Sequence, residues 1–195
     1  MKNLFLILSV IFSISAYLAG IISIIMGGFR PQRMTRFLLF LISILLVATS
    51  FAQGNRNTVY WMLAICIGNL IIFILSIKKG LGGTSKLDIC VFFMVIISLI
   101  VWFTTKDPVV GLTLSIVTDF IAFSPTLIKS WILPETENWK VYMIEVFCSS
   151  CNLLSLSYFS FGKLVFPVYM LLINSTTTSI IFFRGRIKNK FKFNK

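Results

Sequence analysis

Apolar stretches, each close to the length that a bilayer requires, recur along the whole chain and limit what it can fold into. A helix needs about 20 mostly apolar residues to cross the hydrocarbon core. Seven stretches approach that length: 3–26, 36–52, 58–77, 87–104, 108–128, 139–159 and 164–183. The short breaks between them are rich in glycine and proline, which favour turns. The sequence therefore predicts a bundle of seven membrane-spanning helices.

The composition supports the same class. Hydrophobic residues make up 57% of the 195 residues, charged residues 12%, and the mean hydropathy is +0.95. A water-soluble domain with these values would expose large apolar patches. Because the breaks are short, there is no room for a separate soluble domain. We expect an all-α integral membrane protein with a single membrane domain.

The second half of the chain repeats the order and spacing of several polar, basic and helix-breaking residues of the first half. Asn69 is followed by an Ile-Ile-Phe run and then by Lys79-Gly80, and Asn174 is followed by Ile-Ile-Phe-Phe and then by Arg184-Gly185. The interval from Asn to Gly is identical in the two places, and Pro31 and Pro134 fall at nearly the same offset. An internal repeat in a membrane protein is typical of transporters built from two half-bundles.

These correspondences pair the first three helices with the last three and leave the fourth alone. The predicted organisation is a three-helix repeat over 1–80, a linker helix within 81–107, a second three-helix repeat over 108–185, and a basic tail over 186–195. An odd number of helices separates the corresponding elements, so the two halves have the same orientation. We therefore expect parallel repeats, related by an axis along the membrane normal.

The basic residues predict the orientation. Of the 18 Lys and Arg residues, 14 fall on the side that holds the C-terminus and 4 on the other. By the positive-inside rule the N-terminus faces out and the C-terminus faces the cytoplasm. The net charge of +12 follows from this asymmetry and from anionic lipid headgroups as partners, so we expect no nucleic acid. The N-terminus resembles a signal peptide, but its apolar run continues to Met26, which favours an uncleaved helix.

The residue inventory argues against catalysis. The chain has no His, which removes most Ser-His and Cys-His hydrolase schemes and His-ligated metal sites. The four Cys all fall in apolar stretches, and Cys148 and Cys151 share a helix face without a second pair. We expect no enzyme, no cofactor and no metal.

Polar groups within the apolar stretches are the candidate functional residues, because each is costly to bury in a membrane. Asp119 lies near the middle of the fifth stretch and is either a proton-coupling or substrate-binding group or a structural hydrogen-bond partner. Glu145 lies nearer a helix end, where we favour snorkelling or pairing with Lys140 or Lys129.

Asn69 and Asn174 occupy equivalent places in the two halves, so both are expected near the central axis at similar depth. Together they offer donors and acceptors to a polar solute, and the alternative is that they fasten neighbouring helices. Aromatic residues at Trp61, Trp102 and Tyr169 are either stacking partners for a ring or membrane-interface residues.

These features resemble the SWEET and PQ-loop transporter superfamily. The segment 123–131, with Pro125-Thr126, followed by Pro134-Glu135, is similar to a PQ-loop with Thr in place of Gln. The first half departs from the pattern, because Pro31-Gln32 lies in a break and the expected kink position holds Gly20 instead of Pro. The segment 82–88 with the helix after it also resembles a group of uncharacterised bacterial inner-membrane proteins.

The resemblance implies a transporter in the bacterial inner membrane that moves a small polar, sugar- or nucleoside-like solute by alternating access. Asn69, Asn174 and Asp119 would bind the solute, and Pro125 or Gly20 would act as the hinge of the cytoplasmic gate. A homo-oligomer is compatible with it. The alternative function is a non-transporting membrane subunit or scaffold, in which the polar groups only fasten helices.

Overall fold

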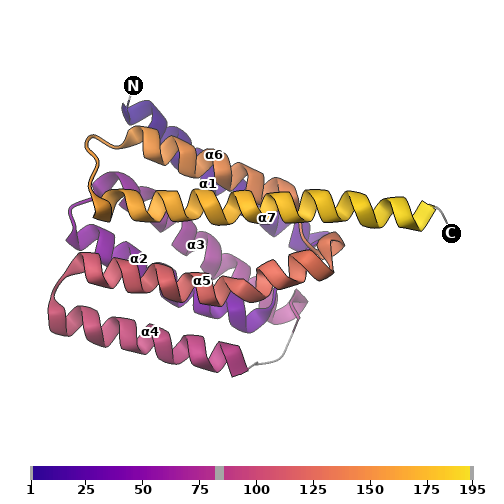
Figure 1. Ribbon diagram of the computed structural model, residues 1–195, viewed down its shortest axis with the longest axis horizontal. Coiled ribbons are helices and arrows are strands. Elements are labelled where there is room, and N and C mark those ends of the chain that lie inside the picture. Colours follow the sequence, from indigo (N-terminus) through magenta and orange to yellow (C-terminus); the bar gives the residue numbers. More distant parts are fainter. Residues whose placement is uncertain (1, 82–85, 194–195) are drawn as a thin grey trace.

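Seven helices joined by short connections make up the described part of the chain, which in this computed structural model covers residues 2–81 and 86–193, with side chains as far as Gly185 (Figure 1). The helices are α1 (Lys2–Ile25), α2 (Arg33–Ala52), α3 (Arg56–Lys79), α4 (Lys86–Thr105), α5 (Pro108–Ile132), α6 (Trp139–Ser155) and α7 (Phe161–Phe193), with a short 3-10 helix η1 (Pro134–Thr136) before α6. No strand occurs within these ranges. The predicted all-helical class is confirmed.

Six of the seven helices are long and apolar enough to cross a membrane. The exception is α6, which has 17 residues and ends at Ser155, four residues before the predicted end of its stretch. The helix stops there because Leu156 takes an extended backbone conformation, with φ −64° and ψ 135°. The residues from Leu156 onward form the connection to α7 and do not lengthen the span.

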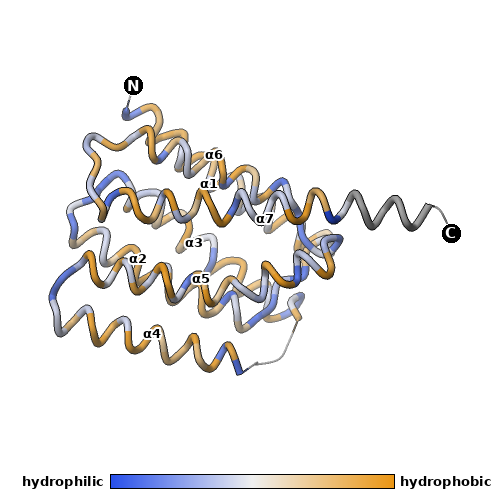
Figure 2. Tube along the Cα trace, viewed as in Figure 1, coloured by the Kyte–Doolittle hydropathy of each residue, from blue (hydrophilic) through white to orange (hydrophobic). Residues whose placement is uncertain are grey.

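Helix α1 is apolar on its exposed side and carries mostly small and polar residues on its buried side, a pattern that fits a lipid environment. In α1 the exposed large apolar side chains form one stripe at helical spacing: Leu4, Ile7, Ile11, Ile14, Leu18, Ile22 and Ile25. The buried face of the same helix carries Ser9, Ser13, Ala16 and Gly20. Hydrophilic residues gather at the two ends of the bundle (Figure 2). This distribution supports a membrane protein, because hydrocarbon solvates the apolar stripe and the small polar residues allow close helix packing.

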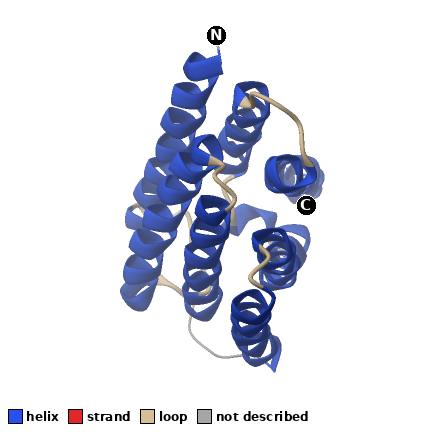
Figure 3. Ribbon diagram, turned by 90° about the vertical axis from the view of Figure 1, so that its left-hand side faces the viewer, coloured by secondary structure: helices blue, strands red, loops and turns tan. Residues whose placement is uncertain are grey.

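Consecutive helices run in alternate directions, so the connections gather at two ends. We call the end with loops 26–32 and 133–138 the basic end, and the end with loops 53–55, 106–107 and 156–160 the opposite end. Helix α1 packs on α3 and α6, α2 packs on α3 and α5, and α7 packs on α5 and α6. Helix α4 packs on α5 and α2 at the edge of the bundle (Figures 1 and 3).

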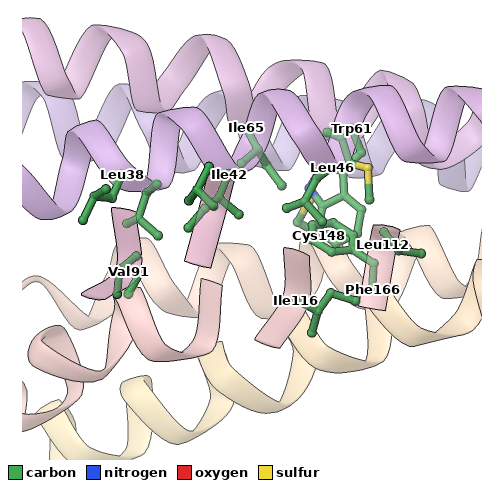
Figure 4. Close-up of a cluster of buried hydrophobic side chains, with 14 residues drawn as sticks. Leu38, Ile42, Leu46, Trp61, Ile65, Val91, Leu112, Ile116, Cys148 and Phe166 are labelled. Atoms are coloured by element: carbon green, nitrogen blue, oxygen red, sulfur yellow. The ribbon is translucent and has the colours of Figure 1, made fainter. Parts of the chain in front are cut away.

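An apolar cluster runs along the bundle, from Leu38 and Val91 in its basic half to Trp61, Leu112 and Phe166 near the opposite end (Figure 4). Trp61 lies near the start of α3, Phe166 near the start of α7 and Leu112 near the start of α5, and all three are almost fully buried. The rings of Trp61 and Phe166 lie 5.2 Å apart between their centroids. Apolar packing therefore closes the bundle centre at this end.

At the basic end, the α1–α2 loop is held against the end of α3. Leu81 donates its backbone N–H to the Pro31 carbonyl at 2.9 Å and accepts from the N–H of Arg33 at 3.0 Å. A Cβ on Gly80 would lie 2.6 Å from the Pro31 carbonyl oxygen, so this approach requires glycine. Around Gly185, its counterpart in the sequence repeat, a Cβ would meet open space. The two glycines therefore do not share a packing role.

Candidate functional site

A cavity of about 100 Å³ lies in the centre of the bundle, between α1, α2, α3, α5, α6 and α7. It extends from Leu46 of α2 and Phe166 of α7 to Phe29 and Glu137 in the loops of the basic end. No described residue of α4 lines it. The cavity is therefore large enough for several waters or a small solute, and it lies nearer the basic end.

All three predicted binding residues, Asn69 of α3, Asn174 of α7 and Asp119 of α5, line this cavity. Within the described part of the chain, the side chain of Asn69 makes no hydrogen bond, although the residue is buried, with only 6% of its surface exposed. The amide of Asn174 donates to the Met170 carbonyl of its own helix at 2.8 Å. Neither amide therefore fastens one helix to another, and both retain hydrogen-bonding capacity toward the cavity.

Asp119 has a hydrogen-bond partner that was not predicted from the sequence. The Tyr169 hydroxyl of α7 donates to its Oδ2 at 2.6 Å, so this hydrogen bond links α5 to α7. Asp119 thus both lines the cavity and connects two helices. Tyr169 serves as a donor to this carboxylate, a role that neither of its two expected alternatives, ring stacking or a place at the membrane interface, included.

Glu145 is a cavity residue that we did not expect. It is 7% exposed, and its Oε1 accepts from the Ser13 hydroxyl of α1 at 3.4 Å. The expected snorkelling or pairing with Lys140 or Lys129 is wrong, because the side chain is buried and, within the described part of the chain, no ion pair joins it to either lysine. Lys129 contacts Glu137 instead. A sequence pattern could have indicated that Glu145 points inward. It shares a helix face, at helical spacing, with the small or polar residues Cys148, Ser149 and Asn152, and this face packs on the small residues of α1.

A polar network borders the cavity at the basic end. The Lys129 ammonium lies 3.0 Å from Glu137 Oε1 and donates to the Arg30 carbonyl at 2.9 Å. The Tyr142 hydroxyl donates to the other Glu137 oxygen at 2.9 Å. These contacts connect the α1–α2 loop, α5 and the start of α6, and sequence patterns alone did not indicate them.

The two hinge candidates lie within continuous helices. Pro125 lacks the N–H that would bond the Ile121 carbonyl, and the Ser124 hydroxyl donates to that carbonyl at 2.7 Å instead. Helix α5 changes direction in its second half (Figure 1). Pro125 lines a small second pocket of about 10 Å³ beside the Lys129–Glu137 network. Gly20 of α1 lines the central cavity, and a Cβ built on it would lie 3.7 Å from the Ile72 side chain.

Tyr17 lies across Gly68, the neighbour of Asn69. A Cβ on Gly68 would overlap the Tyr17 ring, so this helix contact depends on the absence of a side chain. Tyr17 itself lines the cavity. Gly68 therefore sets where the wall of the cavity lies on the α1–α3 side.

The remaining sequence candidates lie outside the cavity. Trp61 is fully buried in the apolar cluster, and Trp102 packs against Gly111 of α5. All four Cys are free thiols, and Cys148 donates to the Ser9 carbonyl at 2.9 Å. Within residues 2–81 and 86–185, no group of three acidic, Cys or His side chains is placed to hold a metal ion.

Two sequence features used above fall partly outside the described residues. Residues 82–85, which carry part of the resemblance to the bacterial inner-membrane group, are among them, and so are the side chains of the basic tail 186–195. Comparison of the chain with family models, with curated proteins and with solved structures finds no match.

Proposed function

We propose that the chain is a transporter that moves a small polar, sugar- or nucleoside-like solute across the bacterial inner membrane by alternating access. The observation that carries this proposal is the placement of Asn69 and Asn174. Two amides from different halves of the chain line one central cavity, and neither fastens one helix to another. A scaffold would satisfy such groups between helices, since an unpaired polar group in a membrane interior is costly.

The helix contacts support two half-bundles, α1–α3 and α5–α7, with α4 as the linker. The proposed symmetry pairs α1 with α5, α2 with α6 and α3 with α7. It predicts that the α1–α3, α2–α3 and α1–α6 contacts have α5–α7, α6–α7 and α5–α2 contacts as their counterparts. All of these contacts occur. Trp61 and Phe166, whose ring centroids lie 5.2 Å apart, have the same sequence separation as Asn69 and Asn174. A parallel pseudo-two-fold axis accounts for both pairs.

The two ends of the cavity differ in the way that alternating access requires. The opposite end is closed by apolar packing around Trp61 and Phe166, whereas hydrogen bonds and one ion pair around Glu137 border the cavity at the basic end. Polar contacts of this kind exchange with water at modest cost. We propose that the basic end is the cytoplasmic gate, that the N-terminus faces out, and that Pro125 and Gly20 allow α5 and α1 to bend.

The experiment is a thermal-stability screen of the purified protein against sugars and nucleosides, followed by uptake of the stabilising solute into proteoliposomes. Asn69→Ala and Asn174→Ala should each abolish stabilisation and uptake while leaving the melting temperature without solute nearly unchanged. The matched control is Asn57→Ala, because the Asn57 amide lies outside the cavity and donates to the Ser155 carbonyl. This control should keep both responses.

Two results would count against the proposal. If both cavity variants lost folded protein, the amides would be structural, as in a scaffold. If the variants took up solute as well as the unmodified protein, the amides would not bind it.

A further inference from the structure

Glu145 presents an unpaired carboxylate oxygen in the central cavity. Among the residues that the structure describes, its buried Oε2 has no hydrogen-bond partner, while Oε1 accepts one long hydrogen bond, from the Ser13 hydroxyl at 3.4 Å. The side chain is 7% exposed and lines the cavity. A carboxylate accepts several hydrogen bonds, and leaving it unsatisfied away from water is expensive. The arrangement therefore lacks a donor, and the cavity is where a donor would sit.

The charges around the cavity favour a cationic donor. Its charged lining residues are Arg36, Asp119, Glu137 and Glu145. Glu137 is offset by Lys129, which lies outside the cavity. One guanidinium thus remains against two carboxylates, and Arg36 lies at the basic end, with its guanidinium carbon 5.4 Å from the centre of the Phe29 ring. A single positive charge on an occupant would balance the lining.

Aromatic rings line the same cavity as this oxygen. Tyr17, Phe123 and Tyr142 line the same cavity, and the Phe123 and Tyr142 rings meet edge to face at 6.2 Å. Aromatic faces attract ammonium groups, most strongly where water is excluded. Carboxylate and rings together are a common way to bind an organic cation.

We propose that the solute carries a protonated amine, whose ammonium group donates to Glu145 while its polar remainder contacts Asn69 and Asn174. This inference rests on the proposed transport function and narrows its substrate class. The ammonium N–H groups satisfy the unpaired oxygen, and the positive charge offsets the excess carboxylate.

The test compares each amine with a neutral counterpart of similar size. Ethanolamine and glucosamine are titrated against ethylene glycol and glucose at one pH, with the melting temperature of the detergent-solubilised protein as readout. We expect each amine to stabilise the protein at lower concentration than its counterpart. Glu145→Gln should weaken amine binding about tenfold or more, since hydrogen bonds to charged groups contribute about 1.5–3 kcal/mol. Glu135→Gln, at an exposed carboxylate outside the cavity, should not.

Equal stabilisation by amines and neutral counterparts in the unmodified protein would overturn the inference, whether or not Glu145→Gln folds. Unchanged amine binding by Glu145→Gln would overturn it as well. Failure here is distinguishable from failure of the transport proposal. If neutral solutes stabilise the protein and the Asn69→Ala and Asn174→Ala variants lose that response, the transport proposal stands and the inference of an amine solute fails.

Discussion

Substitution of Gly68 tests how the cavity wall is built. Gly68→Ala places a methyl group inside the Tyr17 ring, so Tyr17 or the α1–α3 distance must shift. Overpacking of this kind costs about 1–3 kcal/mol. Alanine also stabilises a helix interior by about 1 kcal/mol relative to glycine. The matched control is Gly20→Ala, which has the same gain in helix propensity and meets Ile72 at an ordinary 3.7 Å.

We expect Gly68→Ala to melt several degrees below Gly20→Ala when the detergent-solubilised proteins are compared by fluorescence. Because the displaced ring belongs to the cavity wall, Gly68→Ala should also weaken solute binding. Replacing Tyr17 with leucine should remove most of the cost, so that the two substitutions are not additive. If Gly68→Ala is as stable as Gly20→Ala, or costs as much in the Tyr17→Leu background, the packing argument is wrong.

Three further outcomes follow from the sequence and the structure. A reporter fused after Lys195 should be cytoplasmic and one inserted near Asn55 should be outside, and the reverse would contradict the parallel-repeat proposal. Tyr169→Phe should lower the melting temperature by the equivalent of about 1–3 kcal/mol, because the Asp119 carboxylate loses its donor, whereas Asp119→Asn in the Tyr169→Phe background should recover part of it. Pro125→Ala should fold normally and slow uptake if α5 bends there, and unchanged uptake kinetics would exclude Pro125 as a hinge.

Much of the fold could be predicted because a bilayer leaves a chain few choices. Apolar stretches of spanning length must form helices, since lipid offers no hydrogen bonds to the backbone. The seven helices therefore appear where the apolar stretches lie, and all ends but the last are shifted by four residues or fewer. The largest difference is at the end of α7, which continues to Phe193, ten residues beyond the predicted 183, because the apolar pattern marks only the spanning part of a helix. Helix α6 ends four residues early at Ser155, and α5 ends four residues late at Ile132.

Part of the candidate site could also be predicted from sequence. Asn69, Asn174 and Asp119 stand out because polar residues are costly in apolar segments, and all three line one cavity. Whether they bind solute stays a prediction. Hydrogen-bond partners could not be predicted, because a helix of known position leaves its rotation and neighbours undetermined. The donation from Tyr169 to Asp119 joins helices that are far apart in sequence.

The sequence alone determines that this chain forms apolar helices with polar breaks and a strong basic asymmetry, because these properties depend on length, composition and local periodicity. Tertiary structure decides which polar groups are satisfied and which are left facing the cavity. Glu145 shows the difference. Its place near a helix end suggested pairing with a basic residue, yet packing of α6 on α1 turns it inward, and Lys129 is taken by Glu137. Only the assembled bundle determines which donors come within reach of a buried carboxylate.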